Sequence, residues 1–467
     1  MSCGSNKTTR RPLLFGSVRI LVVRILAIAT AITFLVVGRP EVGGTAQPRP
    51  EPMSQVALTS SSDSTIHVTA SLPPQHLSLN ASGVSVSGRA FTYGYDFSDA
   101  MTTAVWPSAE HQAAKIAATM PGSFEDVAIM GWGPGNPEVS PGIYKFTGIA
   151  NQLSFVKATG GIPIITLCGA PDWMKGGQVG ATDWTQLGLP PQPQHFQDFA
   201  NLSAAVAQAF PDVKYFNVWS ELRGFWSSTT HSWDAASYTT LYNDVYQAVK
   251  AVRPDAAVGG PYVSIHSEAG PAPVRIPTPS GPWGHLDAKS LAPVSFWITH
   301  NVGADFIAVD GRAFTQDAGL TTDPLTSTQK YAAMDQWLTS QTHLPIVWME
   351  SHLLPDTTGY SDQQQASIRV GALLQMASSG ASLGMQWNPE QLAGWDEGLW
   401  TTAQILNGGQ PTVLAQELPA VLNVLAAPVT IVPGTPAGTL VATGANGTVT
   451  VTYSATAATV TVTNPGA

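Results

Sequence analysis

Tyr215-Phe-Asn-Val-Trp-Ser-Glu221 is one of the two stretches that decide the fold, and Leu344-Pro-Ile-Val-Trp-Met-Glu350 is the other. Each is a short apolar run that closes on a carboxylate two residues after a tryptophan. Apolar runs of this length are typical of buried strands. If both are parallel strands of one barrel, their carboxyl ends meet at the same face, and Glu221 and Glu350 face a common cleft.

The middle of the chain repeats a pattern of apolar strand, loop and amphipathic helix eight times. This pattern predicts a parallel (β/α)8 barrel, or TIM barrel, over residues 90–428, with right-handed crossovers between adjacent strands. Ser361 is predicted to cap one of the helices. Helical patterns cover residues 196–210, 238–252 and 329–340, and the predicted strands cover 90–95, 127–130, 162–167, 215–219, 257–260, 306–309, 345–349 and 383–387.

The N-terminal segment is predicted to direct the protein out of the cytoplasm. Basic residues precede the uncharged run 25–37, so residues 1–46 are predicted to be a signal peptide or a signal anchor. A buried N-terminal helix is the alternative, and it would have to hide Arg19 and Arg24. We therefore expect a secreted protein, or one that an uncleaved segment tethers to the membrane.

Two β-rich segments flank the predicted barrel. Residues 47–62 are rich in Pro, Gly, Ser and Thr and predict a flexible linker. Residues 63–89 and 429–467 alternate apolar with polar side chains and predict the strands of a small accessory β-sandwich built from both ends of the chain. An independent C-terminal carbohydrate-binding module is the alternative, but the C-terminal segment is short for a sandwich of its own.

The composition excludes several classes of protein. With 467 residues, 44% of them hydrophobic, the chain can bury a large core. The net charge of -10 and the lack of basic runs beyond the N-terminus exclude a nucleic-acid partner. Cys3 and Cys168 are the only cysteines, so no disulfide framework is expected. His266 and His352 lack metal-ligand spacing, so we expect neither a catalytic metal nor a cofactor.

Glu221 ends the fourth predicted strand and Glu350 ends the seventh, where barrel enzymes place their chemistry. A retaining glycosidase needs a protonated acid and a carboxylate nucleophile about 5 to 5.5 Å apart. A structural ion pair at a strand end is the alternative. Arginine is sparse in this chain and both glutamates follow tryptophan in apolar runs, which favours catalysis.

On these residues the chain resembles the retaining glycoside hydrolases of the large (β/α)8 clan, and within it most closely glycoside hydrolase family 39. The resemblance covers about residues 90–428 and includes the Pro-x-Trp-Met loop of 168–174 and the Gly-Gly-Pro segment of 258–262. It implies that Glu221 is the general acid/base and Glu350 the nucleophile. It also implies that Trp387 stacks on a sugar.

The chain departs from this clan at two places. Ser220 stands where the clan has an asparagine that contacts the sugar 2-hydroxyl, so substrate recognition by Ser220 differs. The sixth strand ends in Val309-Asp310-Gly-Arg312, where the family often has His-x-Tyr. Asp310 and Arg312 either pair with each other or bind a polar or charged group of the substrate. Further candidate binding residues follow other strands, namely Trp132, Trp173 and His352.

The sequence therefore predicts an extracytoplasmic retaining glycoside hydrolase that acts on an extracellular or cell-envelope polysaccharide or glycoconjugate by double displacement. Two alternatives remain open. One is a glycan-binding or envelope-scaffold protein that lacks turnover, and the other is a transglycosylase on the same fold.

Overall fold

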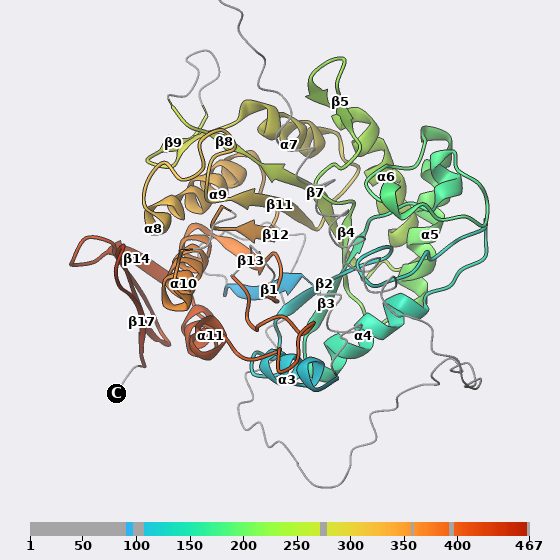
Figure 1. Cartoon of the computed structure of the whole chain (residues 1–467). Helices are drawn as coiled ribbons and strands as arrows, with labels where there is room; N and C mark the ends of the chain where they lie inside the picture. Colours follow the sequence, from blue (N-terminus) through green and yellow to red (C-terminus); the bar gives the residue numbers. More distant parts are fainter. Residues whose placement is uncertain (1–89, 97–106, 271–277, 356–358, 392–396, 465–467) are drawn as a thin grey trace, which may run out of the picture. The chain divides into compact units, whose positions relative to one another are not determined.

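The chain folds into a closed barrel of eight parallel strands (Figure 1). The computed structural model describes residues 90–96, 107–270, 278–355, 359–391 and 397–464. The predicted (β/α)8 barrel is confirmed, with strand order β1-β13-β12-β11-β7-β4-β3-β2. The barrel strands are β1 (Thr92–Asp96), β2 (Phe124–Ala128), β3 (Ile162–Leu167), β4 (Tyr215–Val218), β7 (Ala257–Ile265), β11 (Phe306–Arg312), β12 (Ile346–His352) and β13 (Ala381–Gln386).

Helices surround this barrel and connect successive strands (Figure 1). Ser361 caps α10 as predicted: its hydroxyl accepts a hydrogen bond from the Gln364 N–H, and the Gln364 side chain accepts one from the Ser361 N–H. The helices are α3 (Pro107–Ala117), α4 (Thr147–Thr159), α5 (Phe196–Ala209), α6 (Ala235–Val252), α7 (Ala288–His300), α8 (Pro324–Ser327), α9 (Gln329–Gln341), α10 (Asp362–Ser379) and α11 (Val413–Leu425).

Strand β2 lies earlier in the chain than the sequence predicts. It begins at Phe124 and includes Glu125 and Asp126, which carry charges unsuited to a buried strand. Both carboxylates have partners, because the hydroxyl of Thr159 donates to Glu125 and that of Thr166 donates to Asp126. These hydrogen bonds offset the cost of burial and allow the polar residues into the strand.

Side chains fill the barrel, which confines any chemistry to its ends. Inside the barrel, one cluster includes Phe124, Tyr262, Phe306 and Met385. A larger cluster lies between the strands and the helices and contains the fully buried Trp219, Trp297 and Trp348. Removing this apolar surface from water contributes about 25 cal/mol per Å² and is the main force that holds the fold together.

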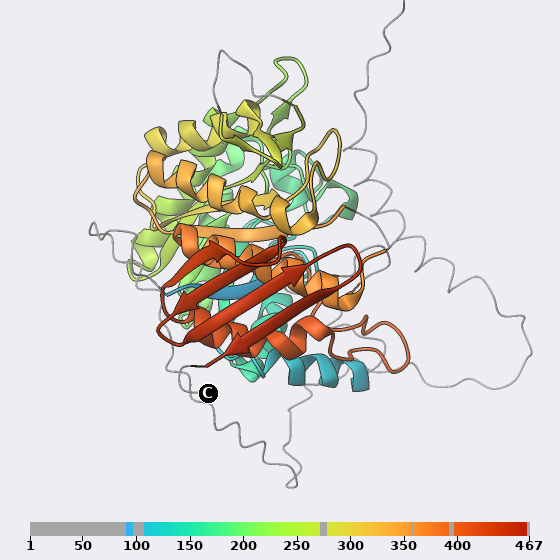
Figure 2. The ribbon, with the colours of Figure 1, turned by 90° about the vertical axis from the view of Figure 1, so that its left-hand side faces the viewer.

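The C-terminal segment forms one antiparallel sheet, seen face-on in Figure 2. Its buried side chains, such as Leu440 and Val451, belong to the same core cluster as residues of α10 and α11. The Gln364 side chain on α10 donates to the carbonyls of Ser454 and Ala455. The residues 63–89 predicted to add strands here lie outside the described residues. The sheet comprises β14 (Val429–Pro433), β15 (Thr439–Gly444), β16 (Gly447–Tyr453) and β17 (Ala458–Thr463).

Short helices and short strands lie in the loops that follow the barrel strands. The loop after β3 holds the short helices η1 (Asp172–Lys175), η2 (Trp184–Gln186) and η3 (Pro193–His195), and the loop after β4 holds the hairpin of β5 (Trp226–Ser227) and β6 (Ser232–Trp233). A three-stranded sheet of β8 (Ser267–Glu268), β10 (Gly284–Leu286) and β9 (Ser280–Gly281) follows β7. Within the described residues, every helix is too short or too polar to cross a bilayer. The predicted segments 1–46 and 47–62 lie outside this part of the chain.

Candidate active site

Glu221 and Glu350 both lie at the carboxyl ends of barrel strands, as the sequence predicts. Glu350 is part of β12. Glu221 follows the end of β4 at Val218 in a tight turn, in which the Arg223 N–H donates to the Ser220 carbonyl at 3.0 Å. Loops and strand ends at this face are where barrel enzymes bind and transform their substrates.

Unusual backbone conformations gather at this face of the barrel. Among the described residues, seven other than glycine have a positive φ, and five of them belong to this face: Trp132, Trp219, Glu221, Leu222 and Tyr262. Each such conformation costs about 1 to 3 kcal/mol and persists only where the surroundings fix it, which is common at functional sites. The Asn217 side chain donates to the Trp219 carbonyl, and the Trp219 indole donates to the Arg223 carbonyl.

Two side chains hold Glu350. The hydroxyl of Tyr262 donates to Oε1 at 2.5 Å, and Nε2 of His352 lies 3.2 Å from Oε2. Burial, and next the charge of Glu350, raise the pKa of Tyr262 well above 10, so this hydroxyl keeps its proton as a donor. Glu350 is only 6% exposed, and both of its oxygens have partners that fix their direction. The sequence did not single out Tyr262 as a site residue.

Arg223 holds Glu221. Its Nε and Nη2 atoms lie 2.9 and 2.5 Å from Oε2 of Glu221. Burial raises the pKa of Glu221, but the charge and hydrogen bonds of Arg223 outweigh burial and hold this pKa below its ordinary range. Glu221 is therefore a carboxylate in the unliganded protein. The charges of Glu221 and Glu350 both raise the pKa of Arg223 against the effect of its burial.

Trp132 lies beside this pair. The Arg223 guanidinium is 5.2 Å from the centre of the Trp132 ring, a distance suited to a cation–π contact. The Trp132 side chain is 42% exposed. The predicted binding residue Trp132 thus presents a free ring area next to the predicted acid/base.

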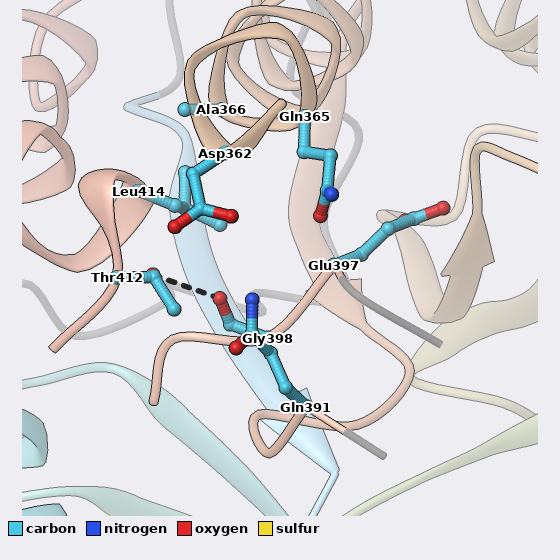
Figure 3. A pocket seen from close by; sticks show the side chains of 8 residues that line it. All are labelled: Asp362, Gln365, Ala366, Gln391, Glu397, Gly398, Thr412 and Leu414. Atoms are coloured by element: carbon cyan, nitrogen blue, oxygen red, sulfur yellow. Dashed lines mark hydrogen bonds between the residues drawn. The ribbon is translucent and has the colours of Figure 1, made fainter. Parts of the chain in front are cut away.

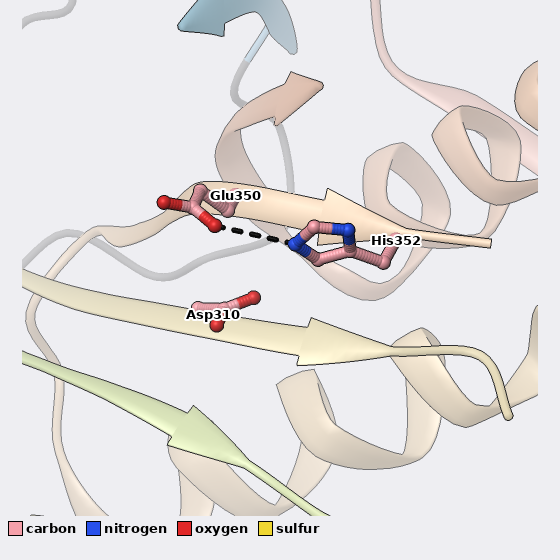
Figure 4. A group of neighbouring side chains, drawn as sticks. All are labelled: Asp310, Glu350 and His352. Atoms are coloured by element: carbon pink, nitrogen blue, oxygen red, sulfur yellow. Dashed lines mark hydrogen bonds and ion pairs between the residues drawn. The ribbon is translucent and has the colours of Figure 1, made fainter. Parts of the chain in front are cut away.

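Asp310 lies directly opposite Glu350 in the pairing of β11 with β12. Figure 4 shows its carboxylate beside Glu350 and His352, and the three side chains have polar atoms within 4.8 Å of one another. Asp310 is 1% exposed. Burial, and then the charges of Glu350 and Glu221, raise the pKa of Asp310 well above its ordinary value. Burial and these two charges therefore favour the protonated form of Asp310.

The hydrogen-bond partner of Asp310 is Glu221. Apart from Glu221, no N–H or O–H group of the described residues reaches either oxygen of Asp310. A hydrogen bond between two carboxyl groups requires one proton, which Asp310 supplies because Arg223 keeps Glu221 ionised. Within the described part of the chain Arg312 forms no ion pair with Asp310, and its guanidinium lies 5.7 Å from the ring of Phe314.

Asp310, Glu350 and His352 also have the donor atoms of a metal site. Two carboxylates and an imidazole within 4.8 Å of one another can ligate a divalent cation such as Zn²⁺. Hydrogen bonds already join these side chains to one another and to their neighbours: Tyr262 and His352 contact Glu350, and Asp310 contacts Glu221. The expectation that catalysis uses no metal stays a prediction.

Two further acidic residues at this end of the barrel were missed in the sequence. Asp96 ends β1, and burial followed by the charge of Glu350 raises its pKa well above the ordinary value. Asp126 on β2 accepts hydrogen bonds from the Thr166 hydroxyl at 2.7 and 2.9 Å, and burial raises its pKa to about 7. In the sequence each is a carboxylate next to apolar residues. Such a charge argues against a buried strand unless its hydrogen-bond partner is known, and the folded structure reveals that partner.

Trp387 joins the site through His352. The two rings are 5.2 Å apart at an angle of 34°. A hollow of about 250 Å³ lies beside them and is lined also by Arg369, Gln386 and Asn388. The tryptophan predicted to stack on sugar therefore borders open space near Glu350.

A second hollow of about 200 Å³ lies between the start of α10 and the segment before α11 (Figure 3). Glu397 and Gly398 line both hollows. In Figure 3 the Thr412 hydroxyl donates to the Gly398 carbonyl at 2.9 Å. Glu397 also pairs with Arg369, which links the wall of this hollow to α10.

The structure places the remaining predicted binding residues differently. Trp173 is packed within its loop: its indole donates to the Glu138 carbonyl at 2.9 Å and its ring contacts His195. Among the described residues, no hydrogen bond or ring contact joins Trp173 to Glu221 or Glu350. Ser220 is buried in the turn that carries Glu221. The substrate-binding roles of Trp173 and Ser220 stay predictions.

Neither a protein-family model nor a curated protein matches the sequence. Solved structures share the fold. A glucosidase from Croceicoccus marinus matches with a TM-score of 0.50 and 13% identity, over 79% of this chain and 76% of that one. A conserved exported protein from Bacteroides fragilis matches with a TM-score of 0.51 and 16% identity, over 78% and 86% of the two chains.

A family 39 β-xylosidase from Caulobacter crescentus also matches, with a TM-score of 0.46 and 14% identity, over 80% of this chain and 79% of that one. At such identities a likeness shows a shared fold and leaves the chemistry to be argued from the site. The closed barrel of eight parallel strands and the matches with TM-scores of 0.50 and 0.51 confirm the (β/α)8 fold that the resemblance implies.

Proposed function

We propose that the protein is a retaining glycoside hydrolase that cleaves glycosidic bonds of an extracellular or cell-envelope polysaccharide or glycoconjugate. The observation that carries this proposal is the pairing of Glu221 with Glu350. Both lie at the carboxyl face of the barrel, and the charges of both act on one guanidinium, Arg223. Two carboxyls with different partners at one barrel mouth are what double displacement needs.

Glu350 suits the role of nucleophile. Tyr262 and His352 fix its oxygens, so the carboxylate needs little reorganisation before it attacks the anomeric carbon. Attack forms a glycosyl-enzyme ester, and the Tyr262 hydroxyl remains beside it as a hydrogen-bond donor. The second half of the reaction releases the sugar to water and restores the carboxylate.

Glu221 suits the role of general acid/base. It would protonate the departing oxygen in the first half of the reaction and take a proton from the attacking water in the second. Trp132 lies beside Arg223 and Trp387 beside His352, so an aromatic ring adjoins a partner of each carboxylate. Such surface suits sugar rings, which have apolar faces.

The decisive variant is Glu350→Gln. We expect turnover to fall by about 10³-fold or more, because an amide cannot act as the nucleophile. The melting temperature should change little, since the amide oxygen still accepts the Tyr262 hydroxyl. Glu125→Gln is the matched control: Glu125 is a buried glutamate on β2 that contacts Thr159 of α4, and its variant should keep turnover.

To identify the substrate, the purified protein is incubated with a panel of envelope and plant polysaccharides. The masses of the products are then measured by mass spectrometry. Proton NMR of the sugar first released should show a retained anomeric configuration. An inverted product would rule out the retaining mechanism, and full activity of Glu350→Gln would rule out the nucleophile.

A glycan-binding protein without turnover is the second candidate, because Glu221 is locked to Arg223 as a carboxylate in the unliganded protein. Binding of a polysaccharide on the same panel, with no sugar released by the wild-type protein, would favour it.

A further inference from the structure

The proposed acid/base lacks a proton in the unliganded protein. Arg223 binds Glu221 through two nitrogen atoms and favours its ionised form. A carboxylate cannot protonate a departing oxygen. Either substrate must separate Glu221 from Arg223, or another group must supply the proton.

Asp310 is the group in a position to do so. We propose that Asp310 stores the catalytic proton and passes it to Glu221, so that the two carboxyls act as one acid/base pair; this rests on the function proposed above. Asp310 touches both catalytic glutamates: it is paired in register with Glu350 and hydrogen-bonded to Glu221.

Asp310 lies buried beside Glu350 and has Glu221 as its hydrogen-bond partner. Its two oxygens are buried, and among the described residues Glu221 is the partner they reach. Its burial and the charges of Glu350 and Glu221 all oppose a third negative charge there and favour the protonated form of Asp310. These are the conditions of two acids that share one proton.

The surrounding charges come from every element packed near Asp310. Glu350 and His352 face it from β12, and Arg312, which lies on β11 like Asp310 itself, lowers the pKa of Asp310. Asp310 acts in turn on groups of neighbouring elements, namely Asp96 of β1, Tyr262 of β7, and Lys330 and Tyr331 of α9.

The first half of the reaction uses this proton. Glu350 attacks the anomeric carbon, the bond to the leaving oxygen breaks, and its electron pair stays on that oxygen. The leaving oxygen takes a proton from Glu221, which receives one from Asp310. Before this step Glu221 and Glu350 are the two ionised carboxyls, and after it Glu221 and Asp310 are.

In the second half of the reaction the proton returns to Asp310. Water attacks the anomeric carbon and gives its proton through Glu221 to Asp310, while the ester bond breaks and its electron pair returns to Glu350. Three carboxyls therefore hold two negative charges throughout.

Formation of the ester is what releases the Asp310 proton. In the free enzyme the charge of Glu350 is one of the causes that keep Asp310 protonated. The ester carries no charge, so this cause is removed when Glu350 has reacted. Asp310 ionises more readily at that point, which couples the proton to the state of the nucleophile.

Asp310→Asn tests the proposal, because an amide fills the same space and can bond Glu221 but cannot deliver a proton. The variant is assayed on two aryl glycosides of the sugar that the wild type cleaves, one with a dinitrophenyl and one with a phenyl leaving group. We expect kcat/KM to fall by about 10²- to 10⁴-fold for the phenyl glycoside. The fall for the dinitrophenyl glycoside should be less than about tenfold, since that group leaves without protonation.

The pH profile gives a readout that a structural role would not move. Wild-type kcat/KM for the phenyl glycoside should fall on the alkaline side as the shared proton is lost, and this limb should be absent from Asp310→Asn. Asp335→Asn is the matched control. Asp335 is a fully buried aspartic acid on α9, bonded to Trp348 and Ser379, and its pKa is raised to about 7 by burial. Its variant should keep the leaving-group ratio and the alkaline limb.

A second measurement needs no variant. In wild-type protein labelled with carbon-13 at its aspartate carboxyls, trapping the ester with a 2-fluoro glycoside should convert one protonated aspartate resonance into a carboxylate resonance at pH 7. The proposal is overturned if this spectrum stays unchanged, or if Asp310→Asn slows both glycosides equally or neither. A wild-type protein that cleaves no glycoside would instead defeat the proposed function itself.

Discussion

At the scale of single residues, Arg223 sets the charge at the mouth of the barrel. It is the ion-pair partner of Glu221 and lies against Trp132, so one side chain links the predicted acid/base to an exposed aromatic ring. The sequence pointed to both glutamates because each ends an apolar run. It did not indicate that the arginine two residues after Glu221 folds back on it.

The pH dependence of stability follows from this pair. The folded pKa of Glu221 lies below its unfolded value, so the pair stabilises the protein above the unfolded pKa of about 4.3, and this contribution is lost as the pH falls through the folded pKa. Arg223→Met should therefore lower the free energy of unfolding by about 2 kcal/mol at pH 7 and by about 1 kcal/mol at pH 3, which lies between the folded and the unfolded pKa.

Urea denaturation at the two pH values measures this difference. Lys214→Met serves as the control because Lys214 pairs with Asp255 at the exposed surface, where salt screens the interaction. An equal loss at pH 7 and pH 3 for Arg223→Met would show that Arg223 does not keep Glu221 ionised.

At the scale of elements, α10 connects the active site to the C-terminal sheet. Arg369 on this helix donates to the hydroxyl and carbonyl of Ser351, the residue after Glu350, and also pairs with Glu397. Gln364 on the same helix bonds the turn after β16. The position of α10 therefore affects both the nucleophile strand and the sheet.

The cap of α10 tests this connection. Ser361→Ala removes the acceptor for the Gln364 N–H and should lower the free energy of unfolding by about 1 kcal/mol, measured by denaturant titration. Ser361→Asp keeps an acceptor and should keep stability. Turnover at room temperature should be the same in all three proteins, and a loss in Ser361→Ala alone would mean that the cap also positions the site.

At the scale of the whole molecule, the C-terminal sheet and the barrel share one core. Val449 and Val451 of β16 are fully buried in the same cluster as residues of α10 and α11. A module that folds alone would bury its apolar face within itself. Here that face is covered by the helices of the barrel.

A chain that ends at residue 428 should therefore lose stability, because it exposes the apolar surface of α10 and α11 to water. We expect its melting temperature to fall, or the barrel to aggregate, and calorimetry of the full chain to show one cooperative transition for barrel and sheet. Two separate transitions, with an unchanged barrel after truncation, would make the sheet an independent module.

The strands and helices of the barrel were largely predictable from sequence because burial on both faces leaves an apolar run that can be read locally. The limits of β2 were not, since Glu125 and Asp126 become acceptable only through Thr159 and Thr166, which are distant in sequence. The site shows the same division. Residues that end apolar runs, such as Glu350, were found, whereas Tyr262 and Asp126 needed the fold to reveal their partners.

The sequence by itself determined a (β/α)8 barrel with Glu221 and Glu350 at its carboxyl face, because periodicity and strand ends are local properties. Only the tertiary structure decided their charges. Arg223 folds onto one glutamate, while Asp310 and Tyr262 come from strands far away along the chain to meet the other. A carboxyl's protonation depends on burial and on neighbouring charges in space, and neither is encoded in the spacing of residues.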